Sequence, residues 1–149
     1  MDRPAHCLQY RRLQWGRRGK HLSRMEHFAE YRDIDIALDP FPHGGGMTTL
    51  EALWMDVPVV TAPGRIISSR LAAGILTAAG LTDLIATNHQ SYVELAASKA
   101  SDLLSLSRLR ATLRDYIART EFGDPVRYAR AVEERYRWMW QRWCSEQAG

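Results

Sequence analysis

The stretch from residue 34 to residue 61 constrains the fold more than any other part of the chain. It opens with a short run of β-forming side chains, residues 34–39, that ends at two prolines. A glycine-rich loop follows, then residues 49–55 with the composition of a helix, and then an almost wholly apolar run at residues 57–61. Uninterrupted apolar strands are typical of parallel sheets that are covered on both faces. This order therefore predicts a βα unit within a parallel sheet.

The rest of the chain predicts more helices and one more short strand. The spacing of apolar residues and the capping signals indicate helices over residues 69–79, 88–100, 106–119 and about 125–144, and a strand over residues 84–86. Gly80 ends the first of these helices, and Thr87 or Asn88 caps the second, with Gln90 near its third position. Only about four strands fit, whereas a complete Rossmann domain has about six. We therefore predict an α/β fold: the later half of a Rossmann-like domain, finished by C-terminal helices.

The final helix has a clear start and an apolar stripe. Asp124 offers a capping carboxylate, and Pro125 suits the first turn of a helix. The stripe consists of residues at helical spacing: Ala129, Val132, Tyr136, Met139 or Trp140, and Trp143. The tryptophans of this helix cannot all face one core, so we expect an apolar face that favours association.

Size and charge limit the possible functions. The 149 residues fit one domain, divided into a basic segment, residues 1–24, and a folded unit, residues 25–149. The basic segment holds seven of the twenty lysines and arginines but only one acid, Asp2. Such a run could bind nucleic acid, but no nucleic-acid-binding motif accompanies it, which favours a solvated segment. No apolar run reaches the roughly 20 residues of a membrane span, and no signal peptide is evident, so we expect a cytoplasmic protein with no membrane partner.

The two cysteines do not indicate a metal site. Cys7 and Cys144 lie near opposite ends of the chain, and neither belongs to a Cys/His pattern with ligand spacing. A disulfide between them is disfavoured in a reducing compartment. We therefore expect no zinc.

The glycine-rich loop before residues 49–55 is the candidate ligand site. In an open α/β sheet, ligands bind beyond the carboxyl ends of the strands, which is where this loop lies. Gly44, Gly45 and Gly46 let the backbone approach a ligand closely, and free N–H groups at a helix N-terminus suit a phosphate or diphosphate. Thr48 and Thr49 add hydroxyl donors.

Glu51 lies one turn into this helix, where its carboxylate could accept hydrogen bonds from ribose hydroxyls. The alternative is an ordinary capping box, in which Thr48 and Glu51 bond only to the backbone of the helix start. No P-loop lysine follows the glycines, which argues against a nucleotide triphosphatase.

Taken with its neighbours, the loop resembles a known family. Residues 33–42, 44–55 and 57–61 together closely resemble the C-terminal catalytic region of the O-linked N-acetylglucosamine transferase family, the SPINDLY-like, tetratricopeptide-linked enzymes. The resemblance covers roughly residues 13 to 143 and makes residues 25–149 a nucleotide-sugar-binding subdomain of a glycosyltransferase with two Rossmann-like domains.

The resemblance implies roles for particular residues. His27 matches a histidine that stacks on uracil, Arg24 matches a basic residue near the diphosphate, and Glu51 matches the acidic residue on the ribose. Gly46, Met47 and Thr48 match a phosphate-binding motif in which relatives carry threonine at the position of Met47. That departure removes one hydroxyl donor but leaves the backbone N–H. Arg70 follows Gly64 at the family's spacing, and we interpret it as structural, joining the loop after Gly64 to the sheet rather than contacting the donor.

The resemblance also implies a reaction: transfer of N-acetylglucosamine from its uridine diphosphate ester to a Ser or Thr hydroxyl. Some relatives transfer fucose from a guanosine diphosphate donor instead. No metal or cofactor is expected, and the acidic pair at residues 33 and 35 lies at the wrong end of its strand to bind a metal at the ligand site. The family's general base and acceptor-binding residues belong to an N-terminal catalytic domain, so we name no catalytic residue here. We expect this chain alone to be inactive and to depend on that domain and a protein acceptor.

Two alternatives remain at this point. A nucleotide-sugar epimerase shares the two-domain architecture and a glycine-rich turn before a helix. A truncated, non-catalytic remnant would bind a nucleotide weakly, or only a partner protein.

Overall fold

The computed structural model describes residues 23–147. Almost all of the predicted basic segment 1–24 falls outside these residues, as does Cys7 of the disulfide considered above, while Cys144 is exposed. Across the described part of the chain, no helix is long and apolar enough to cross a membrane.

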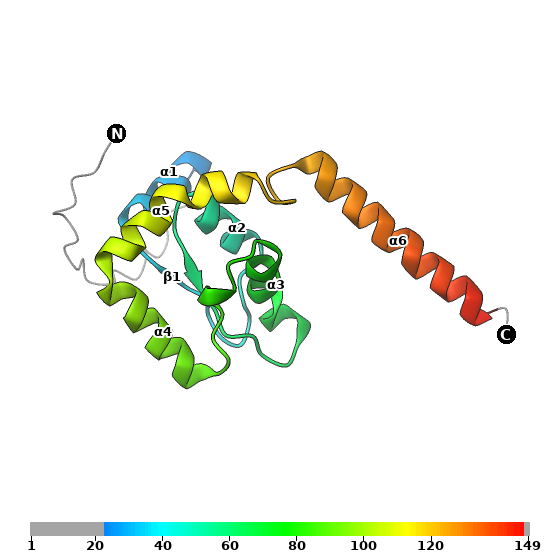
Figure 1. The fold of residues 1–149 in the computed structure, drawn as a ribbon, viewed down its shortest axis with the longest axis horizontal. Helices are drawn as coiled ribbons and strands as arrows, with labels where there is room; N and C mark the ends of the chain where they lie inside the picture. The colour runs from blue at the N-terminus through cyan, green and yellow to red at the C-terminus, as the bar shows by residue number, and fades with distance from the viewer. Residues whose placement is uncertain (1–22, 148–149) are drawn as a thin grey trace.

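A small parallel sheet lies at the centre of the fold. Strand β1 (Ala37–Leu38) pairs in parallel with β2 (Val59–Val60), with Ala37 opposite Val59. One further parallel bridge joins Thr61 to Ile85. The parallel pairing confirms the predicted βα unit (Figure 1).

The strands are shorter and fewer than predicted. Instead of about four strands, the described residues contain two strands and one isolated bridge. Residues 34–36 are not part of β1, because the chain leaves the 3-10 turn η1 (Tyr31–Asp33) and first pairs with β2 at Ala37. Likewise, η3 (Thr82–Leu84) includes the first residue of the predicted third strand, residues 84–86, and of the rest only Ile85 forms a bridge. The chain is thus an α/β structure with a minimal sheet, and a fuller Rossmann topology stays a prediction.

Helices surround this sheet and confirm the four later helices predicted from the sequence. Their bounds are α1 (Arg24–Glu30), α2 (Met47–Trp54), α3 (Leu71–Ala78, after the 3-10 turn η2, Ile67–Ser69), α4 (His89–Ser101), α5 (Leu103–Ala118) and α6 (Pro125–Gln147). Gly80 follows α3 with φ +72°, a left-handed conformation that glycine adopts without strain. Helix α1 was not predicted from the sequence, although Ser23 and Glu26 form a complete capping box at its start.

Two predicted caps are wrong in detail. Helix α2 begins at Met47 with Gly46 as its N-cap, and no side chain caps it, so the Thr48–Glu51 capping box does not form. The Glu51 carboxylate instead contacts His27 of α1. At α4, Asn88 is the N-cap as predicted, but its partner is Ser91, while Gln90 bonds to Glu94.

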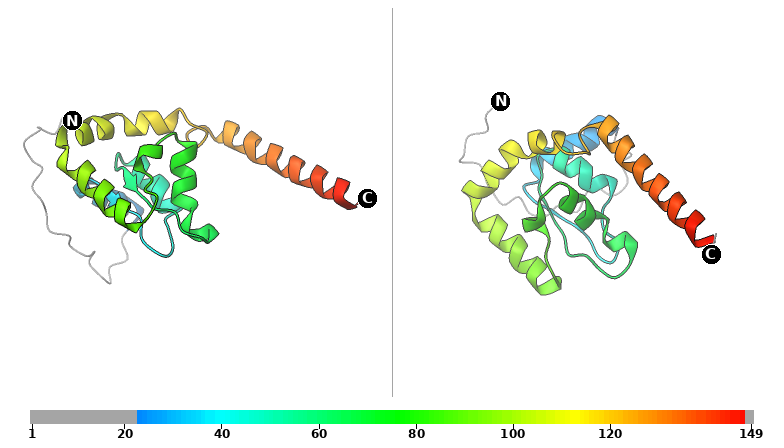
Figure 2. Two further views of the ribbon diagram at one scale, coloured as in Figure 1. Left: turned by 60° about the horizontal axis from the view of Figure 1, so that its bottom comes forward. Right: turned by 45° about the vertical axis from the view of Figure 1, so that its right-hand side comes forward.

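The core lies between α2, α3, α5 and the sheet. Its largest fully buried aliphatic side chains are Leu53, Leu76, Leu84, Leu113, Ile117, Val57 and Val60. Helix α2 packs against both α3 and α5, and α4 packs against α5 and β2 (Figure 1 and Figure 2). This packing fixes α2, and with it the glycine-rich loop at its N-terminus.

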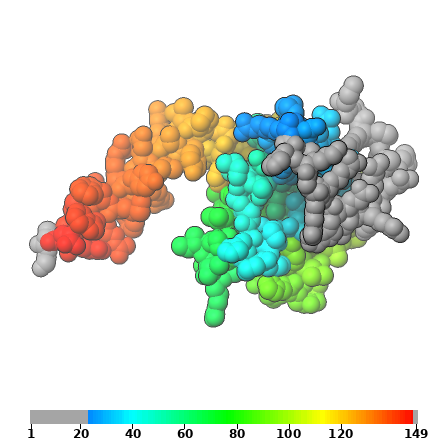
Figure 3. Space-filling model, turned by 180° about the vertical axis from the view of Figure 1, so that it is seen from behind, coloured from blue at the N-terminus to red at the C-terminus, as the bar shows by residue number. Residues whose placement is uncertain are grey.

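Helix α6 stands apart from this body. Its start is as predicted, since the Asp124 carboxylate accepts hydrogen bonds from the N–H groups of Val126 (3.0 Å) and Arg127 (3.1 Å). None of its residues is buried. Figure 3 shows the helix projecting away from the remaining described residues.

Candidate functional site

The loop between β1 and α2 is tied down by one buried carboxylate. Asp39, only 5% exposed, follows β1 directly. Its Oδ1 accepts a hydrogen bond from the N–H of Gly45 at 2.6 Å, and its Oδ2 accepts one from the hydroxyl of Thr61 at 2.6 Å. Asp39 therefore connects the glycine-rich loop to the ends of both β1 and β2.

The glycines of this loop are required by close approach rather than by a left-handed backbone. A Cβ at Gly44 would lie 2.8 Å from Oδ2 of Asp39. A Cβ at Gly45 would lie 2.7 Å from the hydroxyl oxygens of both Thr48 and Thr49. Because real Cβ atoms do not come so close to oxygen, any side chain at either position would have to displace the loop or the two threonines.

The N-terminus of α2 carries a group of hydrogen-bond donors. Among the described residues, none accepts a bond from the N–H of Gly46, Met47 or Thr48, or from the hydroxyls of Thr48 and Thr49. Free N–H groups at a helix start, together with the positive end of its dipole, suit an anion. The N–H of Gly45 is not in this group, because it is used by Asp39.

His27 and Glu51 meet beside this helix start. The His27 Nε2 lies 3.2 Å from Oε2 of Glu51, which joins α1 to α2. The side chains are 46% and 23% exposed, so solvent and a ligand can reach both. The His27 ring also meets the edge of Tyr31 at 5.5 Å, and burial, followed by the charge of Glu51, raises the pKa of Tyr31. The two residues assigned to base and ribose by resemblance are therefore neighbours.

Arg24 stands at the first position of α1, exposed and one turn before His27. Residues three apart on a helix share a face, so Arg24 and His27 lie on the same side of α1. The Ser23 backbone N–H, then the Ser23 hydroxyl, bond to Glu26 and lower the pKa of its carboxyl. This lowered pKa means that Glu26 stabilises α1 at neutral pH and loses that effect as the pH falls through it.

Several contacts of the site were not predicted from the sequence. The Tyr92 hydroxyl of α4 donates to the backbone oxygen of Asp39 at 3.0 Å, and burial, then the charge of Asp39, raises the pKa of Tyr92. On the other side of the loop, His43 Nδ1 lies 3.0 Å from the Ser68 hydroxyl. The one available signal was the position of Asp39, a carboxylate between a strand and a glycine run.

Two further expectations can be compared with the structure. Arg70 does not join its loop to the sheet: it is exposed, and its side chain bonds to no described residue. Asp35 is paired with Arg110 of α5, at the end of β1 away from the glycine loop. Within residues 23–147, no group of His, Cys, Asp and Glu has the arrangement of a metal site.

Comparison with known proteins identifies the family. Residues 19–132 match the family described as Glycosyl transferase family 41. The probable UDP-N-acetylglucosamine–peptide N-acetylglucosaminyltransferase SPINDLY of Petunia hybrida is 41% identical over 123 residues, which cover 83% of this chain and 13% of that protein. The corresponding Caenorhabditis elegans enzyme is 31% identical over 83% of this chain and 11% of its own length.

A solved structure agrees with these matches. A mutant O-GlcNAc transferase of Thermobaculum terrenum superposes with a TM-score of 0.75 at 38% identity, covering 86% of this chain and 24% of that one. The chain thus spans about an eighth of the length of the Petunia hybrida relative and about a quarter of the solved enzyme. These matches decide against the epimerase alternative, and the chain belongs to glycosyl transferase family 41.

Proposed function

We propose that this chain forms the donor-binding wall of a protein O-glycosyltransferase that transfers N-acetylglucosamine from its uridine diphosphate ester to Ser or Thr hydroxyls. The observation that supports this function best is the set of free hydrogen-bond donors at the start of α2, with the His27–Glu51 pair beside it. The relatives are peptide N-acetylglucosaminyltransferases by name, which supports N-acetylglucosamine as the sugar and a protein as the acceptor.

In this proposal each group has one task. The N–H groups of Gly46, Met47 and Thr48, with the hydroxyl of the exposed Thr48, bind the diphosphate and stabilise the charge of the leaving group, while Thr49, only 3% exposed, lies behind them. Arg24 adds a positive charge from α1. His27 stacks on the uracil, and Glu51 accepts hydrogen bonds from the ribose through Oε1, since its Oε2 already faces His27. The proposal assigns no metal and no cofactor to the site.

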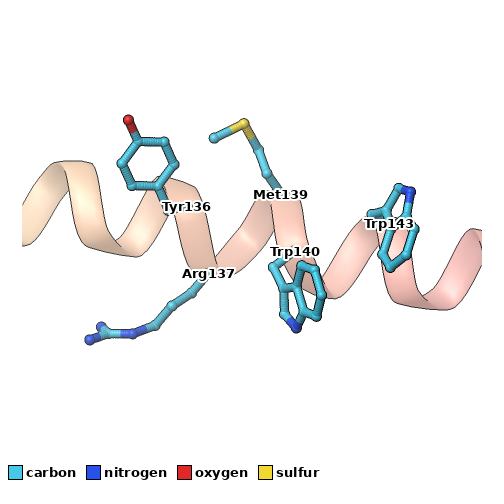
Figure 4. Close-up of a pocket in the computed structure, with 5 residues that line it drawn as sticks. All are labelled: Tyr136, Arg137, Met139, Trp140 and Trp143. Atoms are coloured by element: carbon cyan, nitrogen blue, oxygen red, sulfur yellow. The ribbon is translucent and has the colours of Figure 1, made fainter.

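We further propose that catalysis requires a region of the transferase that this chain does not contain. Helix α6 supports this, because Tyr136, Met139, Trp140 and Trp143 are between 47% and 65% exposed. The Trp140 and Trp143 rings stack at 5.3 Å, and the apolar surface around them is formed by α6 alone (Figure 4). A face of this kind is typical of an interface. We assign no catalytic residue to the chain and expect it to transfer no sugar by itself.

Calorimetric titration with UDP tests the donor site. We expect the wild-type chain to bind UDP with a millimolar or lower Kd. Glu51→Ala should weaken binding about tenfold, because a hydrogen bond to a charged group contributes about 1.5–3 kcal/mol. His27→Ala should also weaken it, through lost stacking on the base. Glu134→Ala, which removes an exposed carboxylate from α6, is the matched control and should leave the Kd unchanged.

Three results would contradict the proposal. Absence of UDP binding at millimolar concentration would remove the donor site. Tighter binding of GDP than of UDP would overturn the assignment of uridine. Sugar transfer or UDP-sugar hydrolysis by the isolated chain would show that no further region is needed.

A further inference from the structure

Asp39 occupies an unexpected place for an acidic residue. It is buried directly behind a loop whose outer side offers donors to an anion. A negative charge there weakens diphosphate binding, since like charges repel more strongly in a low-dielectric interior. A buried carboxylate at this position therefore has to contribute something that outweighs this repulsion. Resting on the function proposed above, we propose that Asp39 is a positioning residue that holds the glycine loop in its phosphate-binding shape, with Thr61 and Tyr92 as its supports.

The loop itself and two segments that are distant in sequence converge on this residue. The Asp39 side chain accepts the Gly45 N–H at 2.6 Å and the Thr61 hydroxyl at 2.6 Å, and its backbone oxygen accepts the Tyr92 hydroxyl at 3.0 Å. Thr61 follows β2 and is fully buried, while Tyr92 belongs to α4. Tertiary contacts, rather than a local helix cap, therefore set the conformation of the loop.

The neighbours of Asp39 restrain the loop on its two sides. The Phe41 ring lies against His89 and Tyr92 of α4, with centroid distances of 4.3 and 5.0 Å. Opposite, the Gly44 N–H donates to the backbone oxygen of Ser68 at 3.1 Å. Directly after these contacts, the N–H of Gly45 donates to Asp39, and the next three N–H groups, of residues 46–48, have no acceptor among the described residues. The hydrogen bond to Asp39 therefore sets the point in the loop at which the free N–H groups begin.

Thr61 gives the cleanest test, because its hydroxyl reaches the loop only through Asp39. In Thr61→Val the Asp39 Oδ2 loses its donor, so the carboxylate is free to turn and release Gly45. Thr61→Ser keeps the hydroxyl and is the conservative control. Binding of UDP and of uridine is measured for the three proteins, by calorimetry and by the chemical shifts of the His27 ring. Uridine shares the base and ribose contacts but has no diphosphate.

We expect Thr61→Val to weaken UDP binding about tenfold and to leave uridine binding unchanged, because only phosphate contacts depend on the loop. Thr61→Ser keeps the hydroxyl, so its Kd values for UDP and for uridine should both stay within about twofold of the wild-type values. Equal losses for UDP and uridine in Thr61→Val would indicate a general loss of structure and overturn the positioning role, as would unchanged UDP binding.

A second variant keeps the test decisive if Thr61→Val does not fold. Tyr92→Phe removes only the hydroxyl that reaches the backbone of Asp39, from a partly exposed position on α4. As expected for Thr61→Val, Tyr92→Phe should weaken the binding of UDP more than the binding of uridine. An unchanged ratio in that variant would contradict the proposal. Failure of the wild-type chain to bind UDP would instead remove the donor site itself, so the two proposals fail in different ways.

Discussion

Leu113→Ala should lower the free energy of unfolding by about 2–5 kcal/mol, the usual cost of removing a buried leucine side chain from a core. Leu113 lies in α5, is 1% exposed, and belongs to the cluster that holds α5 against α2 and the sheet. Because domains of this size are stable by only about 5–15 kcal/mol, the loss would be a large share of the total. The position of α2, and so the donor site, depends on this packing.

Leu104→Ala is a matched control, since it makes the same chemical change in the same helix. Leu104 is 70% exposed, so its removal should change the stability by less than about 0.5 kcal/mol. Urea unfolding followed by circular dichroism measures both variants. Similar losses at the two positions would contradict the assignment of the core. If the slope of the unfolding free energy against urea concentration changes in Leu113→Ala, the unfolded or native state is altered, and the loss is not due to a simple cavity.

The order of elements could be predicted because it depends on local patterns. Apolar runs bounded by proline and glycine marked β1 and β2, and Asp124 before Pro125 marked the start of α6. Strand length could not be predicted in this way, since it depends on where a neighbouring strand stops pairing. The apolar stripe of α6 indicated a helix but said nothing of which surface would cover it.

The capping boxes show the limit of local patterns more sharply. Ser23 to Glu26 and Thr48 to Glu51 have the same spacing, yet only the first forms a capping box. The second fails because α2 begins at Met47 with Gly46 as its N-cap, which places Thr48 inside the helix, and Glu51 instead contacts His27, 24 residues away in the sequence. The site residues that were missed share this property. Asp39 is identified as a structural centre only through Thr61 and Tyr92, 22 and 53 residues along the chain.

Gly45→Ala should weaken UDP binding by about a hundredfold, or about 2.7 kcal/mol, the loss of at least two hydrogen bonds to a charged ligand. The added Cβ would lie 2.7 Å from the hydroxyl oxygens of both Thr48 and Thr49. Relief of that clash turns both hydroxyls away or moves the loop off Asp39, which currently holds the Gly45 N–H at 2.6 Å. Either response removes donors that the diphosphate would use.

Gly74→Ala is the matched control for this substitution. Gly74 lies inside α3, and a Cβ there would meet nothing within 4 Å. Alanine should stabilise the helix by about 0.5–1 kcal/mol and leave UDP binding unchanged. Calorimetry measures the affinities, and thermal unfolding shows that both variants are folded. A Gly45→Ala protein that binds UDP within twofold of wild type would mean that the ligand does not lie against this loop, because a methyl group in contact with both threonines cannot leave a diphosphate bound at the same place undisturbed.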